Sequence, residues 1–422
     1  MRRTKSTSAL IALGVLLTAC GSGGDAADPS GDPSASGSTS AASSILIWSD
    51  PAHAAALQAS AATHQQTTGV EVLVQTVGTD LSKIRDDITV LAPQGQGPDL
   101  FVGQSDWVGR LADYGLLAPV DLSTRSSSFR PVAVDGVTYQ ARTYAVPFAT
   151  ENLALFRNTA LAPEAPESID VMARNGLELA AKDDQILPIA LPVGGQGDAY
   201  HWYPFYSAGG GKIFGTDSQG GYTADELEIG SAGSVEAAKR LAELTEEGAL
   251  DGDTTADDAL TAFTSGRSPY LISGPWSVEP VRQSGTPFVV EAVPGFDSVL
   301  ASRSQALVIS QGLFQSAFAR NAAAAQEYLA TTAMTTEVMS ALAAPGGLGP
   351  AWVDSYANAA SDPVIKGFGD YADSSAPMPN LAEMDLVIPA LSQAQVDVMS
   401  GEDPARTMKS AGREIQAAID AS

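Results

Sequence analysis

The 422-residue chain has little of the side-chain chemistry on which most enzymes depend. It holds a single cysteine, so an internal disulfide is excluded, and only three histidines, which stand outside any metal motif such as HExxH. It has no GxSxG nucleophile elbow and no glycine loop of the phosphate- or dinucleotide-binding kind. We therefore expect a binding protein without catalysis, metal or cofactor. An exported glycoside hydrolase stays an alternative, because the separation of two catalytic carboxylates is a spatial quantity.

Basic residues are also scarce. The chain has 23 Lys and Arg against 49 Asp and Glu, a formal net charge of −26. Nucleic acid and anionic membrane surfaces are disfavoured as partners, because both require a basic face. Beyond the N-terminal segment no apolar run is long enough to span a bilayer. The length exceeds what one compact core holds, so we expect two lobes.

The N-terminal segment has the layout of an export signal. Arg2, Arg3 and Lys5 precede an apolar stretch at 9–18 that is too short for a permanent membrane helix. The sequence LTAC that ends at Cys20 resembles the lipobox of bacterial lipoproteins, which implies a signal over 1–20 and a lipid on Cys20. Residues 21–44 are small or polar and predict a flexible tether. An ordinary secretory signal with an incidental buried cysteine is the alternative.

The remaining sequence alternates between strand-like and helix-like patterns, which predicts an α/β fold. The predicted strands are 45–48, 70–77, 99–103, 153–156, 185–192, 270–273, 287–293 and 305–310. The predicted helices are 52–65, 81–91, 105–114, 234–247, 317–331 and a last one that starts at Asp403-Pro404 and continues to the end.

Short motifs in a fixed order resemble one family over residues 45–422. They are GPDLF at 97–101, DWVG at 106–109, GLL at 115–117, AVPFATENL at 145–153, the segment 200–211, FTSGR at 263–267, SGPW at 273–276 and MPN at 378–380. Together they resemble extracellular sugar-binding proteins of ABC importers, of the maltose, maltodextrin and cyclodextrin branch. The resemblance implies a two-lobe periplasmic-binding-protein-like fold with a hinge crossed three times. The expected lobes are 45–150 with 303–357 and 151–302 with 358–422.

The resemblance also implies a set of ligand-binding residues. Sugars offer apolar ring faces and hydroxyl rims, so aromatic platforms and carboxylates suit them. We expect Trp276 to stack on a sugar ring and Glu151 and Asp106 to accept hydroxyl protons. The other candidates, by position in the family motifs or near them, are Trp107, Tyr200, Asp198, His201, Met378 and Asp50, with His53 as a further rim contact.

Several positions depart from the maltose binders. Trp107 replaces an arginine next to Asp106, while Gly103 and Ile388 lie at or near places of tryptophans. Fewer platforms suggest a wider groove, for a bulkier or cyclic oligosaccharide or another glycan. A polyol or sugar phosphate is a more distant alternative.

The other two tryptophans, Trp48 and Trp352, are expected in core or rim packing. The partners implied are an oligosaccharide, a membrane permease and the membrane through the lipid. We expect a monomer that closes over its ligand.

Overall fold

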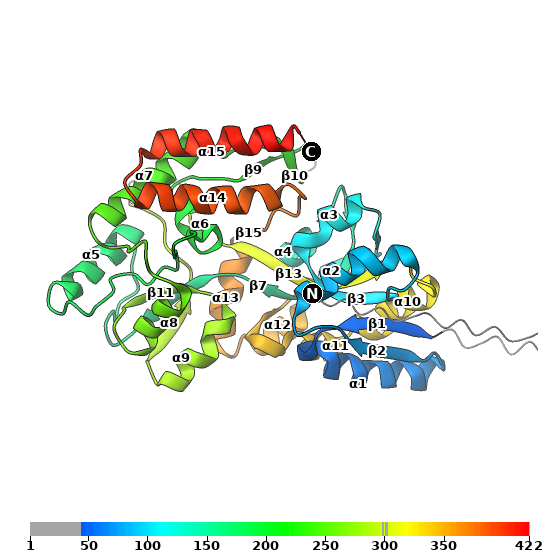
Figure 1. The fold of residues 1–422 in the computed structure, drawn as a ribbon. Helices are drawn as coiled ribbons and strands as arrows, with labels where there is room; N and C mark the ends of the chain where they lie inside the picture. The colour runs from blue at the N-terminus through cyan, green and yellow to red at the C-terminus, as the bar shows by residue number, and fades with distance from the viewer. Residues whose placement is uncertain (1–43, 219, 298, 300–302, 422) are drawn as a thin grey trace, which may run out of the picture. The chain divides into compact units, whose positions relative to one another are not determined.

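The structure is a computed structural model that describes residues 44–421 except 219, 298 and 300–302 (Figure 1). The predicted signal, the Cys20 lipidation site and the tether up to residue 43 lie outside these residues. Within the described part, no helix combines the length and the apolar character needed to cross a membrane.

The larger of the two main sheets has eight strands. Its central order is β14-β7-β13-β3-β1-β2, and β4 and β15 pair with β13 as well. β1 is parallel to β2 and β3, whereas β13 runs antiparallel to β3 and β7. The strands are β1 (Ile45–Ser49), β2 (Val72–Thr76), β3 (Leu100–Gln104), β4 (Leu117–Ala118), β7 (Ala145–Glu151), β13 (Leu307–Ser316), β14 (Gly349–Pro350) and β15 (Ala376–Pro377).

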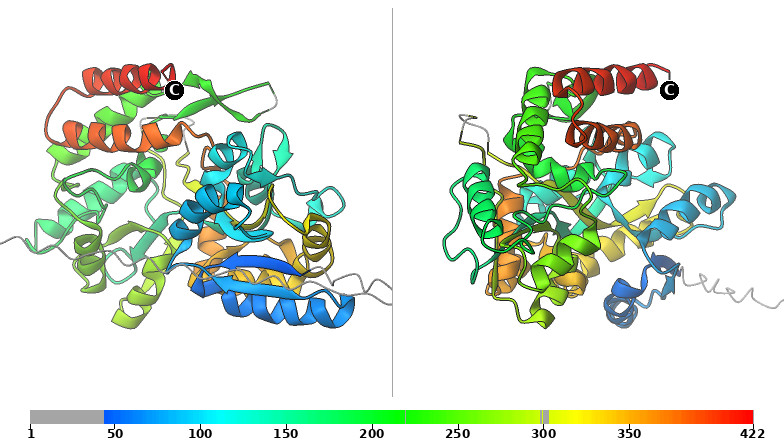
Figure 2. Two further views of the ribbon diagram at one scale, coloured as in Figure 1. Left: turned by 45° about the vertical axis from the view of Figure 1, so that its right-hand side comes forward. Right: turned by 60° about the vertical axis from the view of Figure 1, so that its left-hand side comes forward.

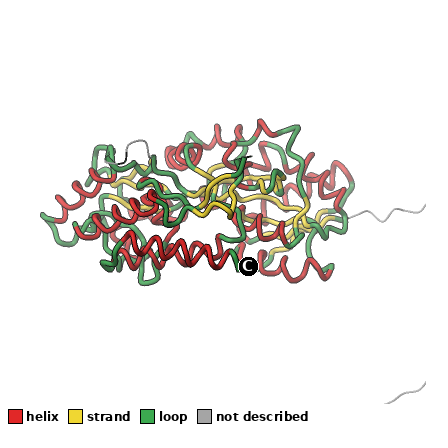
Figure 3. The backbone as a smooth tube through the Cα atoms, turned by 90° about the horizontal axis from the view of Figure 1, so that it is seen from above, coloured by secondary structure: helices red, strands yellow, loops and turns green. Residues whose placement is uncertain are grey.

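Helices pack against this sheet through their apolar sides (Figure 3). Strands β1, β3, β7 and β13 are largely buried, whereas the edge strand β2 is mostly exposed. α1 begins after Asp50, whose carboxylate accepts from the Ala52 N–H, and ends at Gly69, which takes the left-handed conformation. The helices are α1 (Pro51–Thr68), α2 (Leu81–Leu91), α3 (Val108–Asp113), α4 (Pro131–Gly136), α10 (Ala322–Tyr328), α11 (Thr336–Ala343) and α12 (Val353–Ala359). A small ribbon is formed by β5 (Thr138–Tyr139) and β6 (Arg142–Thr143).

The second main sheet has three antiparallel strands in the order β11-β8-β12: β11 (Tyr270–Ser273), β8 (Ala154–Asn158) and β12 (Phe288–Glu291). At its centre Phe156 stacks on Phe288 at 5.7 Å and meets Phe263 and Phe368 edge-on. The elements around it are α5 (Ile169–Ala180), α6 (Ala199–Ala208), α7 (Ala232–Glu246), α8 (Ala256–Thr264), α9 (Val278–Ser284), α13 (Pro363–Asp373), α14 (Met384–Met399), α15 (Pro404–Ile419) and the hairpin β9 (Phe214–Thr216) with β10 (Tyr222–Leu227). α14, α15 and α7 lie side by side (Figures 1 and 2).

The chain passes from the larger sheet to the second one between β7 and β8 and returns between β12 and β13. After β14 it continues through α12 to α13, which packs on β12. A buried arginine, Arg130, connects the end of β7 to α13. The Arg130 guanidinium donates to Thr150 Oγ1, to the carbonyl oxygen of Gly369 and to Asp373, and lies 4.4 Å from the Tyr356 ring. Because its donors all meet acceptors, this charge is buried at a tolerable cost.

Most predicted elements are confirmed, with ends shifted by a few residues. The predicted strand 185–192 is wrong: only one bridge forms there, between Ala190 and Leu271. Pro188 and Pro192 lack the N–H that a strand ladder needs. The helix predicted over 317–331 begins only at Ala322, because β13 extends to Ser316.

Candidate functional site

Three polar side chains form a row across the larger sheet. Gln104 on β3 is directly opposite Gln311 on β13, and Gln311 is opposite Ala149 on β7. Glu151 follows Ala149 by two residues and therefore points to the same face. The Gln311 Nε2 donates to Glu151 Oε2 at 3.2 Å. All three line one cavity of about 500 Å³.

Trp276 also lines this cavity. It follows β11 in the short 3₁₀ turn Pro275–Ser277, and its side chain is 49% exposed. The indole lies against the backbone of Gly274, where a Cβ would come within 2.2 Å of Trp276 Cζ3. One part of the ring is thus supported and another is open, which is the arrangement of a stacking platform.

A buried acid–imidazole pair lines the same cavity. Asp50 Oδ1 lies 2.6 Å from His53 Nδ1, and both side chains are buried. The His53 ring packs 5.0 Å from Phe148. Its Nε2 is buried and has no hydrogen-bond partner among the described residues. His53 therefore lines the cavity with a buried ring nitrogen that has no partner in the described part of the chain.

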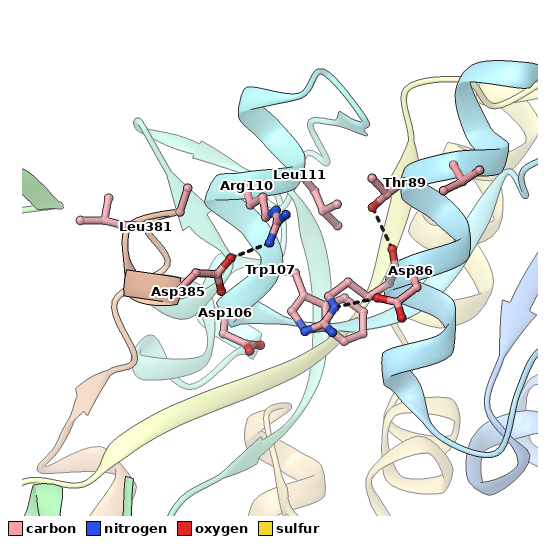
Figure 4. Close-up of a pocket in the computed structure, with 11 residues that line it drawn as sticks. Asp86, Thr89, Asp106, Trp107, Arg110, Leu111, Leu381 and Asp385 are labelled. Atoms are coloured by element: carbon pink, nitrogen blue, oxygen red, sulfur yellow. Dashed lines mark hydrogen bonds and ion pairs between the residues drawn. The ribbon is translucent and has the colours of Figure 1, made fainter. Parts of the chain in front are cut away.

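Asp106 and Trp107 border a second cavity of about 360 Å³ between α2, α3 and the start of α14 (Figure 4). Asp106 Oδ1 is buried without a hydrogen-bond partner in the described part of the chain. Burial raises the pKa of Asp106 to about 6, against a smaller opposing effect of the Arg85 charge. At the outer edge of this cavity Arg110 pairs with Asp385 of α14.

Trp107 is largely a core residue, 5% exposed. Its indole covers Gly103: a Cβ there would meet Trp107 Cζ3 at 2.9 Å and the Phe314 ring at about 3 Å. Arg85 lies over the indole at 6.0 Å. The tryptophan at 107 and the glycine at 103 therefore fit each other, and only part of the indole borders the cavity.

α6 supplies three more of the predicted residues. Asp198 caps the helix by accepting from the His201 N–H, and its second oxygen lies 2.7 Å from His201 Nδ1. The His201 ring lies between Tyr200, at 5.9 Å, and Trp276, at 6.0 Å, edge-on to both. The candidates Tyr200, His201 and Trp276 thus form one aromatic cluster.

The acids and Tyr200 influence one another. Burial, followed by the charges of Glu151, Asp106 and Asp198, raises the pKa of Tyr200 well above its usual value, and its hydroxyl has no partner among the described residues. Burial and the Asp106 charge raise the pKa of Glu151, while the hydrogen bond from Gln311 lowers it. These groups are therefore close enough for their charges to interact.

Four of the predicted residues line neither cavity: Asp198, Tyr200, His201 and Met378. Met378 is buried in the apolar core, and its N–H donates to the Val308 carbonyl oxygen. Trp48 and Trp352 are buried, as expected, and Ile388 packs against the core. Gln104 and Gln311 also line the first cavity, and neither was predicted from the sequence. No group of three or more His, Cys, Asp or Glu side chains suited to a metal is found in the described part of the chain.

Three known proteins that the chain resembles are oligosaccharide-binding proteins by name. The chain is 27% identical to the maltotriose-binding protein of Pyrococcus abyssi over 314 residues, 72% of this chain and 66% of that one. It is 25% identical to the galactooligosaccharide-binding protein of Bacillus subtilis, over 97% and 96% of the two chains. A maltooligosaccharide ABC transporter solute-binding lipoprotein of Streptococcus pneumoniae is 23% identical over 96% and 94%.

Solved structures share the fold. A cyclo/maltodextrin-binding protein complexed with maltotetraose aligns with a TM-score of 0.79 at 23% identity, over 89% of this chain and 97% of that one. An extracellular solute-binding protein of Staphylococcus aureus in complex with maltose gives 0.80 at 22%, over 90% and 98%. Residues 58–367 match the family described as bacterial extracellular solute-binding protein. With most of its length inside that match, the chain belongs to this family of bacterial extracellular solute-binding proteins.

Proposed function

We propose that this protein is the lipid-anchored substrate-binding component of an ABC importer, and that it captures malto-oligosaccharides or related gluco-oligosaccharides and delivers them to a permease without chemistry of its own. Relatives named as maltotriose- and maltooligosaccharide-binding proteins support the ligand class. The family is one of transport proteins, which supports a binding role over an enzymatic one.

One observation carries the proposal: the half-exposed indole of Trp276 faces a cavity that Glu151 also lines. An aromatic face attracts the C–H face of a pyranose, and a carboxylate accepts the protons of its hydroxyls. Further residues extend this site. His201 and Tyr200 join Trp276 through ring contacts, and the charges of Glu151, Asp106 and Asp198 act on Tyr200.

The lobes proposed for closure are 45–150 with 303–357 and 151–302 with 358–422. Asp106 would act from the first lobe, Glu151 from the boundary between the lobes, and Trp276 and Tyr200 from the second lobe. A sugar that contacts both lobes binds the closed form more tightly, and only that difference in affinity can drive closure. The closed, monomeric protein would then dock on the permease.

The anchor is proposed to be a lipid on Cys20. A Cys20→Ser variant expressed in a bacterial host should leave the membrane fraction and fail to incorporate labelled palmitate. Retention of the label would contradict the assignment.

The ligand class is tested by thermal unfolding of the purified protein with maltotriose. A binder raises its melting temperature according to ligand concentration and affinity, and leaves the sugar intact. Mass spectrometry of the sugar after incubation covers the glycoside hydrolase alternative, because hydrolysis would yield shorter products. No shift with maltotriose, maltodextrins and cyclodextrins would refute the gluco-oligosaccharide assignment.

A second candidate ligand is a galacto-oligosaccharide. It is favoured by the relative of that name, which matches nearly the whole of both chains. A shift with galactotriose in the absence of one with maltotriose would select this candidate, with the same fold and the same site.

A further inference from the structure

We infer that Gln311 both positions Glu151 and contacts the ligand. Its carboxamide nitrogen donates a hydrogen bond to Glu151, and its carboxamide oxygen accepts a hydrogen bond from a hydroxyl of the sugar ring that Glu151 binds. This inference rests on the proposed function and adds a specific polar anchor to it.

The first support is the state of the side chain. Gln311 is 6% exposed and borders the cavity that contains Trp276. Its Nε2 is used by Glu151, but its Oε1 is buried with no hydrogen-bond partner in the described part of the chain. A buried carboxamide oxygen without a donor is costly. Because Gln311 lines the cavity, a ligand hydroxyl can supply that donor.

The second support is the backbone around it. The pairing of β13 with β7 steps from Gln311–Ala149 to Gly312–Pro147, which leaves Phe148 unopposed as in a β-bulge. Pro147 has no N–H to continue the ladder, and Gly312 leaves no room for a side chain, since a Cβ would lie 3.0 Å from the Val146 oxygen. Bulges of this kind re-aim side chains next to functional sites.

The third support is the set of hydrogen-bonding groups that the row of Gln104, Gln311 and Glu151 offers to a ligand. Gln311 and Glu151 form one hydrogen-bonded pair in the cavity lining, so an amide and a carboxylate are available there to neighbouring hydroxyls of a pyranose. Gln104, opposite Gln311, supplies a further amide at the same cavity. The arrangement favours a ligand with vicinal free hydroxyls over one in which these are substituted.

The chain offers a matched control on the same strand. Gln315 is 1% exposed, donates through Nε2 to the Ala322 carbonyl oxygen and also has a buried Oε1 without a partner among the described residues. It does not belong to the cavity lining. Replacing either glutamine removes the same atoms from the same kind of environment, but only Gln311 faces the proposed ligand.

The test measures affinity by calorimetry for whichever glycan gives the largest melting shift with the wild type. Gln311→Ala should weaken binding by about tenfold or more, because it removes one acceptor and frees a charged partner. Gln315→Ala should stay within about twofold of the wild type at a similar cost in melting temperature. Equal affinity of the wild type and Gln311→Ala, or equal losses in both variants, would overturn the inference.

Gln311→Glu separates positioning from simple loss of packing. This variant keeps the shape and an acceptor oxygen but places a carboxylate against Glu151, near Asp106, Tyr200 and the Asp50–His53 pair that shares the cavity. At neutral pH binding should be weak. In mildly acidic buffer the two carboxyls share a proton and restore the hydrogen bond, so the affinity relative to wild type should rise.

A relative affinity of Gln311→Glu that does not change with pH would refute the positioning role. Wild-type protein that binds another glycan but no gluco-oligosaccharide would refute only the ligand class proposed above. Binding of no glycan at all would overturn both proposals.

Discussion

Replacing Trp276 by Ala tests the stacking platform directly. The side chain is 49% exposed and rests on the backbone of Gly274, with His201 as its aromatic neighbour at 6.0 Å. Because half of the indole is already in solvent, its removal leaves no internal cavity. The unliganded protein should therefore lose less than about 1 kcal/mol of unfolding free energy.

The loss of affinity should be much larger. A tryptophan side chain offers about 150–250 Å², so the open half is roughly 100 Å². Covering most of that with a sugar ring at about 25 cal/mol per Å² is worth roughly 2 kcal/mol. A specific ring–face contribution of about 0.5–1.5 kcal/mol brings the expected loss to about 2.5–3.5 kcal/mol, some sixtyfold to several-hundredfold in Kd.

Isothermal titration calorimetry with maltotriose measures this loss, and thermal unfolding without ligand checks the fold. Trp276→Phe serves as the control, since it keeps a smaller aromatic face and should lie between the wild type and the alanine variant. An alanine variant that binds within about twofold of the wild type, at an unchanged melting temperature, would refute the stacking argument.

Three further predictions concern Gly274, Asp106 and Arg130. Gly274→Ala should weaken sugar binding without unfolding the protein, because its Cβ would displace the Trp276 indole; calorimetry showing wild-type affinity would contradict this. Asp106→Asn should weaken binding yet raise the unfolding free energy at neutral pH by about 1–3 kcal/mol. Burial raises the pKa of Asp106 to about 6, so the charged carboxylate destabilises the fold at neutral pH, and this penalty disappears as the pH falls from about 6 towards 4. Denaturant titrations of both proteins across this pH range measure it, and an equal or lower stability of the variant at neutral pH would contradict it. Arg130→Met should lower the free energy of unfolding by about 3 kcal/mol in the same assay, because several buried acceptors lose their donor. Arg110→Ala, which breaks an exposed ion pair, should lower it by less than about 1 kcal/mol. Equal losses would contradict the argument from burial.

Local sequence signals predicted those elements whose ends are set by local chemistry. Asp403 and Pro404 predicted the start of α15, and the Asp403 carboxylate accepts from the Arg406 N–H there. The failures came where tertiary pairing decides. β13 runs to Ser316, past the end of the predicted strand at 310, because β3, β4 and β7 all pair with it. No local pattern marks a strand whose partners lie some 200 residues earlier.

The candidate site divides in the same way. Trp276 and Glu151 stand in recognisable motifs, so the sequence could single them out. Gln311 lies within a strand and gives no signal of its own. Its role follows only from the register that sets it opposite Gln104 and diagonal to Glu151. The fit of Trp107 over Gly103 was equally hidden, because it depends on how the turn after β3 folds back on the strand.

The unsatisfied polar atoms around the cleft give the strongest physical reason to expect a polyhydroxyl ligand. His53 Nε2, Asp106 Oδ1, Tyr200 OH and Gln311 Oε1 are all buried and lack a hydrogen-bond partner in the described part of the chain. They come from four separate elements, so no single local misfit accounts for them. Each such group costs folding about 1–3 kcal/mol. A sugar whose hydroxyls both donate and accept offers the hydrogen-bonding groups that all four types of atom lack. Hydrogen bonds from a ligand to these atoms would remove a cost that the unliganded protein carries. We therefore expect these atoms to contribute to the affinity of the site for its sugar.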